Sequence, residues 1–243
     1  MTFVFTLITS IFLASIAAFA AEECEVPSSL ISSDSELTHA TKEIRDHKRL
    51  DISVVGTGSS TLPGPDGAQF AYPARLEAAL IQRLSGVDIK VVAHVQPRRT
   101  TAQMAADLKK ILAADKPALV IWQAGTFDAV SGIELEEFRN SLDDGANSIE
   151  AAPADLDLMN MQYSPRTDSM LSVSAYADVM RWVAQQHGAL LFDRLSIMRS
   201  WNDAGTFDLY TTTKNYDMAR KVHDCIGRAL ASQIISATHV VTP

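Results

Sequence analysis

The chain has 243 residues, and its 21 lysines and arginines against 29 aspartates and glutamates give a net charge of −8. Nucleic-acid binding depends on a basic face that neutralises phosphates, so this acidic balance argues against a nucleic-acid partner. Without its apolar N-terminal segment the chain keeps about 220 residues, enough for one α/β domain with a substantial core.

The first twenty residues carry no charged side chain, and residues 3–20 are mostly apolar. Ala18-Phe19-Ala20 fits a small-x-small cleavage site and is followed by acidic residues. We therefore predict a signal peptide over residues 1–20, export to the periplasm or the cell exterior, and no stable membrane span after cleavage. The alternative is an uncleaved N-terminal anchor, since the apolar segment approaches the length that spans a bilayer.

From residue 51 onwards, apolar strands alternate with amphipathic helices. Residues 21–50 are predicted to be a polar N-terminal arm with a short helix near 38–48, and residues 238–243 a C-terminal tail. Strands are predicted at 52–55, 89–95, 118–122, 156–161 and 189–192. Helices are predicted at 72–84, 101–114, 135–149, 171–187, 194–203 and 217–236. This alternation predicts one α/β domain over residues 51–237, with a five-stranded parallel sheet and helices on both faces.

Two segments combine a strand with a turn of small residues. Residues 56–61 read Gly-Thr-Gly-Ser-Ser-Thr after the first strand, and residues 72–77 (Tyr-Pro-Ala-Arg-Leu-Glu) open the next helix. Residues 121–128 read Ile-Trp-Gln-Ala-Gly-Thr-Phe-Asp, a strand that runs into a glycine turn. Strand, tight turn with an exposed serine, then helix is how an α/β fold presents a nucleophile at the carboxyl edge of its sheet.

Together these segments resemble the SGNH (GDSL-type) hydrolase family, and the resemblance extends over residues 50–236. It implies a flavodoxin-like three-layer SGNH-hydrolase fold, and the chain is identified as a divergent secreted bacterial member whose catalytic blocks are degenerate. The sequence shows no metal-ligand spacing, no Walker loop and no dinucleotide fingerprint, so neither a metal nor a cofactor is expected.

The resemblance implies a serine nucleophile in the first turn. Aligning Thr61 with the Ser or Thr that commonly follows the nucleophile selects Ser59. Aligning Gly58 with the leading glycine of the family selects Ser60 instead, so Ser60 stays the alternative. Backbone N–H groups of this turn, with Gly58 and Ser60, are expected to stabilise the oxyanion.

The family's other oxyanion donors are replaced here. The third block normally reads Gly-x-Asn-Asp, whereas this chain has Gly125-Thr126-Phe127-Asp128. Phe127 has no polar hydrogen, and loss of one oxyanion donor typically costs on the order of 10²–10³ in rate. Gly125, Thr126 and Asp128 are expected to line the cleft, with Asp128 holding loops together. The second block lacks its glycine, and Pro97 in that loop has no N–H to donate, although the N–H groups of Arg98 and Arg99 could substitute.

The general base is also altered. The family's last block reads Asp-x-x-His, and alignment on the closing helix places Lys214 at the Asp position and Asp217 at the His position. A carboxylate with a pKa near 4 is a poor base for a serine, which argues against an ordinary esterase mechanism. His94 and His223 are the candidate replacements, and Lys214 would act only if burial depressed the pKa of its amine.

The chain has two cysteines, Cys24 and Cys225. In an oxidising compartment such a pair is expected to form a disulfide, which would close about 200 residues and stabilise the fold by roughly 5 kcal/mol. The alternative is two free thiols. A disulfide at these positions would be structural rather than catalytic.

These observations leave two hypotheses about function. The first is an envelope hydrolase of the esterase or deacetylase type, acting on a small-molecule, lipid or glycan ester with a serine nucleophile and an unconventional base. The second is a catalytically inactive SGNH-like protein that keeps the cleft to bind an acylated or carbohydrate ligand. The serine turn supports the first, and the lost family residues support the second.

Overall fold

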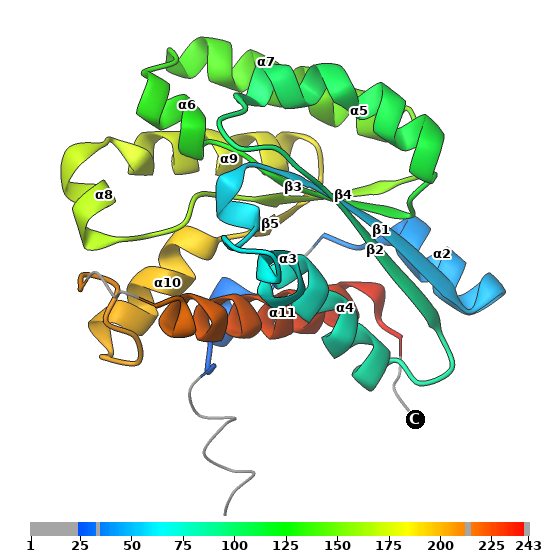
Figure 1. Ribbon diagram of the computed structural model, residues 1–243. Helices are drawn as coiled ribbons and strands as arrows, with labels where there is room; N and C mark the ends of the chain where they lie inside the picture. The colour runs from blue at the N-terminus through cyan, green and yellow to red at the C-terminus, as the bar shows by residue number, and fades with distance from the viewer. Residues whose placement is uncertain (1–23, 33–34, 212–214, 241–243) are drawn as a thin grey trace, which may run out of the picture.

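The computed structural model describes residues 24–32, 35–211 and 215–240 (Figure 1). The predicted signal peptide and Lys214 lie outside these residues. Within them, no helix combines the length and the apolar character that a membrane span requires.

Five parallel strands form the central sheet, in the order β2-β1-β3-β4-β5. Their bounds are β1 (Arg49–Gly56), β2 (Asp88–Val95), β3 (Leu119–Gln123), β4 (Asp155–Met159) and β5 (Leu190–Phe192). Along the chain β1 is the first strand of the sheet. The next strand, β2, lies on one side of β1, and the other three strands lie on the opposite side. The carboxyl end of β1 is therefore the point where the winding reverses, and open α/β sheets bind their ligands at such a point.

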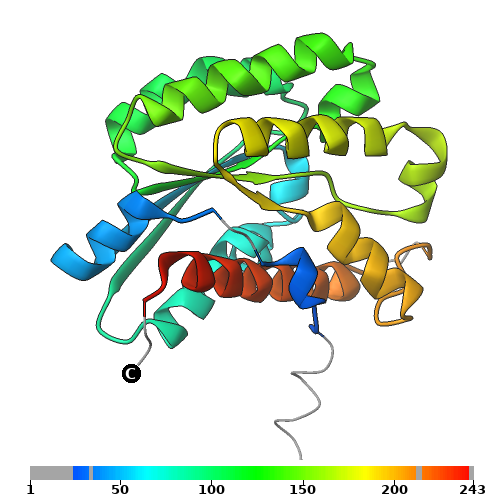
Figure 2. The same ribbon diagram turned by 180° about the vertical axis from the view of Figure 1, so that it is seen from behind.

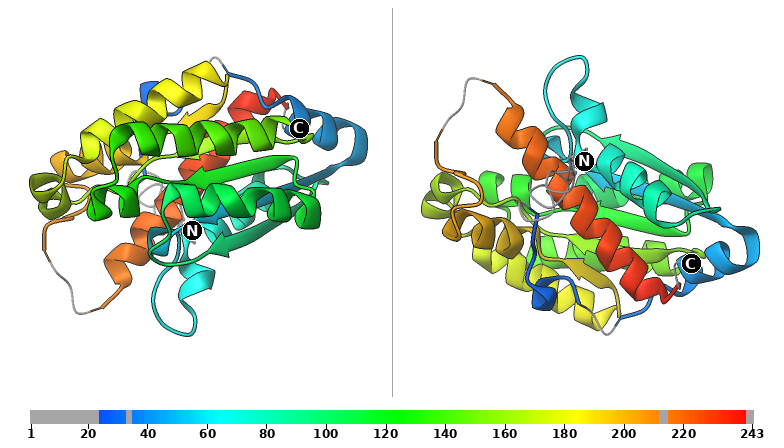
Figure 3. Two further views of the ribbon diagram at one scale, coloured as in Figure 1. Left: turned by 90° about the horizontal axis from the view of Figure 1, so that it is seen from above. Right: turned by 90° about the horizontal axis from the view of Figure 1, so that it is seen from below.

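Helices cover both faces of the sheet, as Figures 1 and 2 show from opposite sides. One face carries α5 (Thr101–Asp115), α7 (Leu135–Glu150) and α9 (Val173–Gln186). The other carries α4 (Tyr72–Arg83), α10 (Arg194–Asp203) and α11 (Asp217–Thr238). In the views from above and below, α5 lies beside α7, and α4 lies beside α11 (Figure 3). The predicted three-layer α/β fold is thereby confirmed.

Short helices complete the connections. They are η1 (Ser28–Leu30), α2 (Thr38–His47), η2 (Gly58–Ser60), α3 (Gly67–Phe70), α6 (Thr126–Ser131) and α8 (Pro165–Met170). The helix α2, from the segment predicted as a polar arm, buries Ala40 and Ile44 in the core. Its N-terminal end is tied to the sheet, because the Asp155 carboxylate accepts the backbone N–H of Ala40 at 2.8 Å.

A disulfide joins Cys24 to Cys225, which lies in α11. This confirms the predicted pairing, and it links residues 201 positions apart in the sequence. Nearby, the Trp201 indole donates a hydrogen bond to the backbone oxygen of Glu25 at 2.8 Å. The first described residues are thus held against the helices that cover one face of the sheet.

One carboxyl group is buried in the core itself. Asp157 lies in β4, is fully buried, and neither of its oxygens makes a hydrogen bond of good geometry to the described residues. Burial raises the pKa of Asp157 to about 8, and the nearby backbone N–H of Phe192 offsets only part of this effect. Asp157 is therefore mostly protonated at neutral pH, and the folded state holds a proton that the unfolded chain releases.

This proton uptake makes stability depend on pH. The pKa of Asp157 in the folded state exceeds its value near 4 in the unfolded chain. The free energy of unfolding should therefore fall as pH rises from about 4 to about 8. This group alone contributes a slope of up to about 1.4 kcal/mol per pH unit. Asp157→Asn should remove most of that slope and be more stable than wild type at pH 9. Urea unfolding between pH 5 and 9 measures this pH dependence, with the exposed Asp144→Asn as control. Equal slopes in Asp157→Asn and wild type would contradict the raised pKa of Asp157.

Candidate functional site

The turn after β1 is built around a glycine. A Cβ on Gly56 would lie 2.4 Å from Ser60 Oγ, so a larger residue would push the serine away. The following turn closes with a hydrogen bond from the Ser60 N–H to the Thr57 carbonyl at 2.9 Å. This places Ser59, which is half-buried, at the carboxyl edge of the sheet, and it buries Ser60 almost completely.

The side chain of Gln123, the last residue of β3, organises this turn. Its Oε1 accepts hydrogen bonds from the Thr57 N–H at 3.1 Å, the Thr57 hydroxyl at 3.2 Å, and the Ser59 and Ser60 hydroxyls at 3.1 Å each. The Thr57 N–H can only donate, and this fixes the amide orientation with the oxygen toward the turn. On its other side, Nε2 donates to the Thr126 hydroxyl at 3.3 Å.

A buried arginine contacts the same serine. Arg194 begins α10 directly after β5 and is only 1% exposed. Its Nη2 donates to Ser59 Oγ and its Nη1 to the Ser59 carbonyl, both at 3.1 Å. Within the described residues no carboxylate forms an ion pair with this guanidinium, and its Nε has no partner. Burial lowers the pKa of Arg194 to about 10, so the group is still a cation at neutral pH.

Ser60 belongs to a second chain of contacts. Its hydroxyl lies 3.0 Å from the Tyr72 hydroxyl, and the Tyr72 N–H donates to Nδ1 of His223 at 3.0 Å. The two rings stack with their centroids 5.9 Å apart. Burial raises the pKa of Tyr72 to about 12, so its hydroxyl is neutral.

His223 is held in one neutral form by these contacts. Burial, together with the positive charge of Arg194, lowers the pKa of His223 to about 3. Because Nδ1 accepts the Tyr72 N–H, it carries no proton, and the proton of the neutral ring must sit on Nε2. In this arrangement the only basic nitrogen of His223 is occupied, and the structure shows no hydrogen bond from His223 to Ser59 or Ser60.

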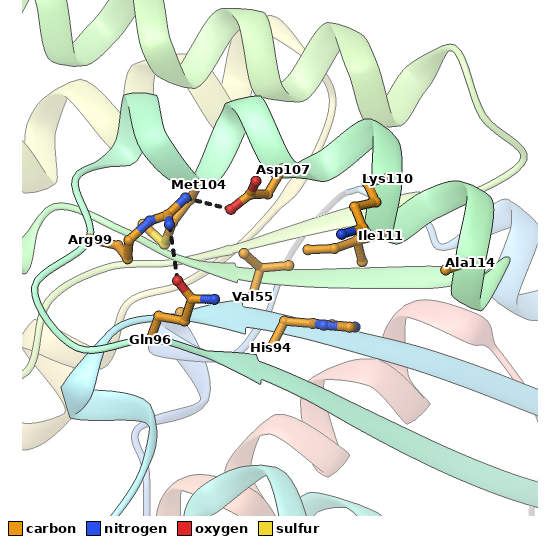
Figure 4. A pocket seen from close by; sticks show the side chains of 10 residues that line it. Val55, His94, Gln96, Arg99, Met104, Asp107, Lys110, Ile111 and Ala114 are labelled. Carbon is orange, nitrogen blue, oxygen red and sulfur yellow. Dashed lines mark hydrogen bonds and ion pairs between the residues drawn. The ribbon is translucent and has the colours of Figure 1, made fainter.

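His94 has a different environment. Its Nε2 lies 2.5 Å from the Asp115 carboxylate, which also accepts the Ser53 hydroxyl at 2.7 Å. Figure 4 shows the ring of His94 extending toward the Ala114 end of α5, away from Gln96. His94 makes no described hydrogen bond to Ser59 or Ser60, so neither candidate histidine is joined to the serines as a general base.

The Gly125–Asp128 block serves to position helices. Gly125 has a φ of +88°, and a Cβ there would lie 2.5 Å from Met161 Sδ. The buried Asp128 carboxylate accepts the Thr101 N–H and the Thr101 hydroxyl at 2.9 Å each, which anchors the start of α5. Burial raises the pKa of Asp128 above its ordinary value, and the Thr101 bonds partly offset this rise. Phe127 is half-buried.

The residue at the family's histidine position lies at the start of α11. Asp217 is exposed and accepts a hydrogen bond from the Asn215 side chain at 2.7 Å. The structure shows no bond from Asp217 to either serine, and Lys214 is outside the described residues. Within the described chain, no three His, Cys, Asp or Glu side chains come together as ligands for a metal ion.

Three polar residues of this edge were not assigned a role from the sequence: Gln123, Asn160 and Arg194. Asn160 accepts the Leu195 N–H at 2.8 Å and donates to Asp193 at 2.7 Å, so it fixes the segment that carries Arg194. All three residues stand at or just beyond the carboxyl end of a buried strand. That position is a usable signal, because side chains from these strand ends meet at one edge.

Comparisons with known proteins place this geometry in context. The model of the Non-GDSL lipase-like family matches residues 23–240. A comparison with curated protein sequences gave no match.

Solved structures share the fold at low sequence identity. TesA is 23% identical, with 75% of this chain and 99% of TesA covered and a TM-score of 0.60. A putative lipolytic protein of the G-D-S-L family from Desulfitobacterium hafniense is 14% identical, with 76% and 99% covered and a TM-score of 0.58. Axe2, an acetylxylan esterase from Geobacillus stearothermophilus, is 16% identical, with 79% and 95% covered and a TM-score of 0.59. Structures described as catalytic mutants of Axe2 carry alanine in place of a serine, an aspartate or a histidine.

The contacts of Gln123 give a direct test of how the site is held. Gln123→Met keeps the side-chain volume but removes the acceptor shared by Thr57, Ser59 and Ser60. Because it leaves the buried Thr57 N–H without a partner, we expect a loss of about 1–3 kcal/mol in the free energy of unfolding. Urea unfolding measures this loss, with the exposed Gln185→Met in α9 as the matched control. A loss no larger than that of the control would mean that Gln123 does not organise the turn.

Proposed function

The chain belongs to the Non-GDSL lipase-like family, and we propose that it is an ester hydrolase whose nucleophile is Ser59. The family match, together with the fold shared with TesA and Axe2, confirms the resemblance to the SGNH hydrolases. The lipolytic and acetylxylan-esterase descriptions of proteins with this fold support an ester as the substrate class. That class covers small-molecule, lipid and glycan esters.

The observation that carries the proposal is the pair of contacts on Ser59 Oγ. The hydroxyl proton is directed at Gln123 Oε1, while the Arg194 guanidinium donates to the oxygen itself. A buried cation at 3.1 Å stabilises the negative charge that develops on Oγ when the serine attacks an ester carbonyl. Arg194 thus makes Ser59 Oγ more reactive by stabilising its negative charge. In a conventional serine hydrolase, a neighbouring base activates the serine by removing its proton.

The contact between Ser59 and Arg194 determines which protonation state of the pair is reactive. The reactive form is one proton short of the resting form, and it can be written as a serine alkoxide beside the cationic guanidinium or as a serine hydroxyl beside a neutral one. These two forms contain the same number of protons, so a pH profile reports them together. The proton leaves to solvent, Ser59 Oγ attacks the ester carbonyl, and the ester C–O bond breaks as the alcohol departs with a proton from solvent. Water then attacks the acyl-serine carbonyl, which releases the acid and restores the Ser59 hydroxyl. The relevant pKa is that of the Ser59–Arg194 pair rather than that of a histidine.

The developing oxyanion needs donors other than the family's asparagine. The Thr57 and Ser60 N–H groups are engaged within the turn, which leaves the N–H groups of Gly58 and Ser59 as the donors we assign to this role. Phe127 supplies none. We therefore expect slow turnover compared with an enzyme that has a full set of oxyanion donors.

A second candidate function has its own supporting observation. Neither His94 nor His223 contacts Ser59, and the basic nitrogen of His223 is already used by the Tyr72 N–H. An SGNH-like protein without a free base at its serine fits a binding role, in which the retained cleft holds an acylated or carbohydrate ligand without cleaving it. Labelling of the serine separates the two functions.

We further propose that the protein works in the cell envelope. The predicted signal peptide at residues 1–20 is the basis for this location. The Cys24–Cys225 disulfide supports it, because such bonds form and persist in oxidising compartments and are rare in the reducing cytosol.

The nucleophile is tested with a fluorophosphonate on the purified mature protein. Ser59→Ala should abolish labelling, whereas Ser60→Ala should keep part of it, because Ser60 only shares the Gln123 and Tyr72 contacts. The labelling rate of wild type should rise about tenfold per pH unit from pH 7 toward about 10, instead of levelling off near neutral pH as with a histidine base. Circular dichroism at each pH shows that the protein is folded. No labelling of folded protein between pH 6 and 10 would reject the hydrolase and favour the binding role.

The role of Arg194 is tested separately with two variants. Arg194→Gln keeps a hydrogen-bond donor but removes the charge, and we expect the labelling rate to fall by about 10²–10³. Arg194→Lys restores a charge without the planar fork, and it should recover part of the rate. Equal rates in wild type and in folded Arg194→Gln would show that the guanidinium has only a structural role.

A further inference from the structure

A pocket lies on the β2 side of β1, whereas Gln123, which accepts the hydroxyl of Ser59, ends β3 on the other side of β1. It has a volume of about 230 Å³ and is enclosed between α5 and the carboxyl-terminal parts of β1 and β2 (Figure 4). It exists because β2 is the edge strand of the sheet, and α5 packs over β1 without covering β2 completely. Ser59, Gln123 and Arg194 do not line it; the lining includes Gly56, which precedes the serine turn, and His94, which makes no described hydrogen bond to the serines.

The pocket has an apolar floor. Val55 contributes from β1, and Met104 and Ile111 contribute from α5; all three side chains are buried. Figure 4 shows Val55 in the centre, with Met104 and Ile111 on either side of it. Such a surface favours an apolar body on the ligand, since covering it removes apolar area from water.

The rim is polar, and its hydrogen-bonding groups are mainly donors. Arg99 is fixed there by bonds to Gln96 Oε1 at 2.9 Å and to the Asp107 carboxylate, and its buried Nε has no partner in the described chain. The Gln96 amide accepts from Arg99 through its oxygen, so its Nε2–H₂ group is left for a ligand. Lys110 stands exposed on the opposite part of the rim and forms no ion pair with a described residue.

Among the charged side chains that line the pocket, Lys110 forms no ion pair with a described residue. Asp107 is the only carboxylate that lines the pocket among the described residues, and it is already paired with Arg99. The nearby Asp115 is bound to His94 and to the Ser53 hydroxyl. Lys110 therefore provides a positive charge for which the pocket itself has no partner, while the free groups on the rim require an acceptor.

From this arrangement we propose that the pocket is a binding site for a small organic carboxylate with an apolar body. The body lies on Val55, Met104 and Ile111, and the carboxylate accepts from Lys110 and the Gln96 amide. Arg99 and Asp107 form one wall, made rigid by their mutual bond. The proposal does not depend on ester hydrolysis, because Ser59 directs its hydroxyl to Gln123 and Arg194 on the opposite side of β1.

The test uses benzoate as the probe, with benzamide as a neutral molecule of nearly the same shape. Titration of purified mature protein, followed by calorimetry and by amide chemical shifts, should show saturable binding of benzoate and at least about tenfold weaker binding of benzamide. Shifts should centre on β2 and α5. No saturation by benzoate at millimolar concentration, or equal affinity for the two molecules, would overturn the proposal.

Matched variants locate the site. Lys110→Gln should weaken benzoate binding about fivefold, while Lys109→Gln, its exposed neighbour that does not line the pocket, should leave it unchanged. Ala114→Phe should abolish binding by filling the exposed end of the pocket, with Ala113→Phe as its control. Ser59→Ala should bind benzoate like wild type. Loss of binding in Ser59→Ala, or unchanged binding in folded Lys110→Gln and Ala114→Phe, would place the carboxylate elsewhere and contradict the assignment.

Discussion

The guanidinium of Arg194 is buried against Ser59 without a carboxylate partner in the described chain, and its positive charge acts on the ionisable groups beside it. An unpaired charge in the protein interior is costly unless hydrogen bonds compensate it. Here two of the compensating acceptors belong to a single serine. The same cation helps to hold His223 in its neutral form and favours ionisation of the neighbouring Tyr72 against the effect of burial. Burial is the larger cause at both residues, and the charge of Arg194 adds to it at His223 and opposes it at Tyr72.

The scaffold shows how this charge is kept in place. Asn160 ties the end of β4 to the segment after β5, and Asp193 accepts from Asn160 and from the backbone of Ser196 at the start of α10. Gln123 performs the corresponding task for the turn after β1. The ends of β4 and β5, and those of β1 and β3, are thus joined in two pairs by side chains that are themselves bonded to backbone groups. Such supporting bonds are what restricts a functional group to one geometry.

The fold could be predicted from the sequence because its long elements carry strong patterns. The β1 strand and the helices α4, α5 and α11 were placed within a few residues, whereas α6 and α8 were missed because six residues are too few to show a helical period. The serine turn was found from its glycines. The role of Arg194 could not be found from the sequence, because it depends on the strand order. That order brings Arg194 into contact with Ser59, 135 positions away in the chain. The direction of the His94 ring could not be predicted either. The position of a residue in a strand determines the face of the sheet on which its side chain lies, but not its hydrogen-bond partner.

The disulfide between Cys24 and Cys225 has a consequence for the handling of the protein. It closes nearly the whole described chain into a covalent ring, because the two cysteines lie close to its ends. A protease that cuts any one loop inside this ring leaves both fragments attached to each other. Such a nicked molecule keeps its mass on a gel without reductant and separates into two pieces only when thiol is added. Apparent resistance to proteolysis in an oxidising medium is therefore a property of the ring as much as of the packed core.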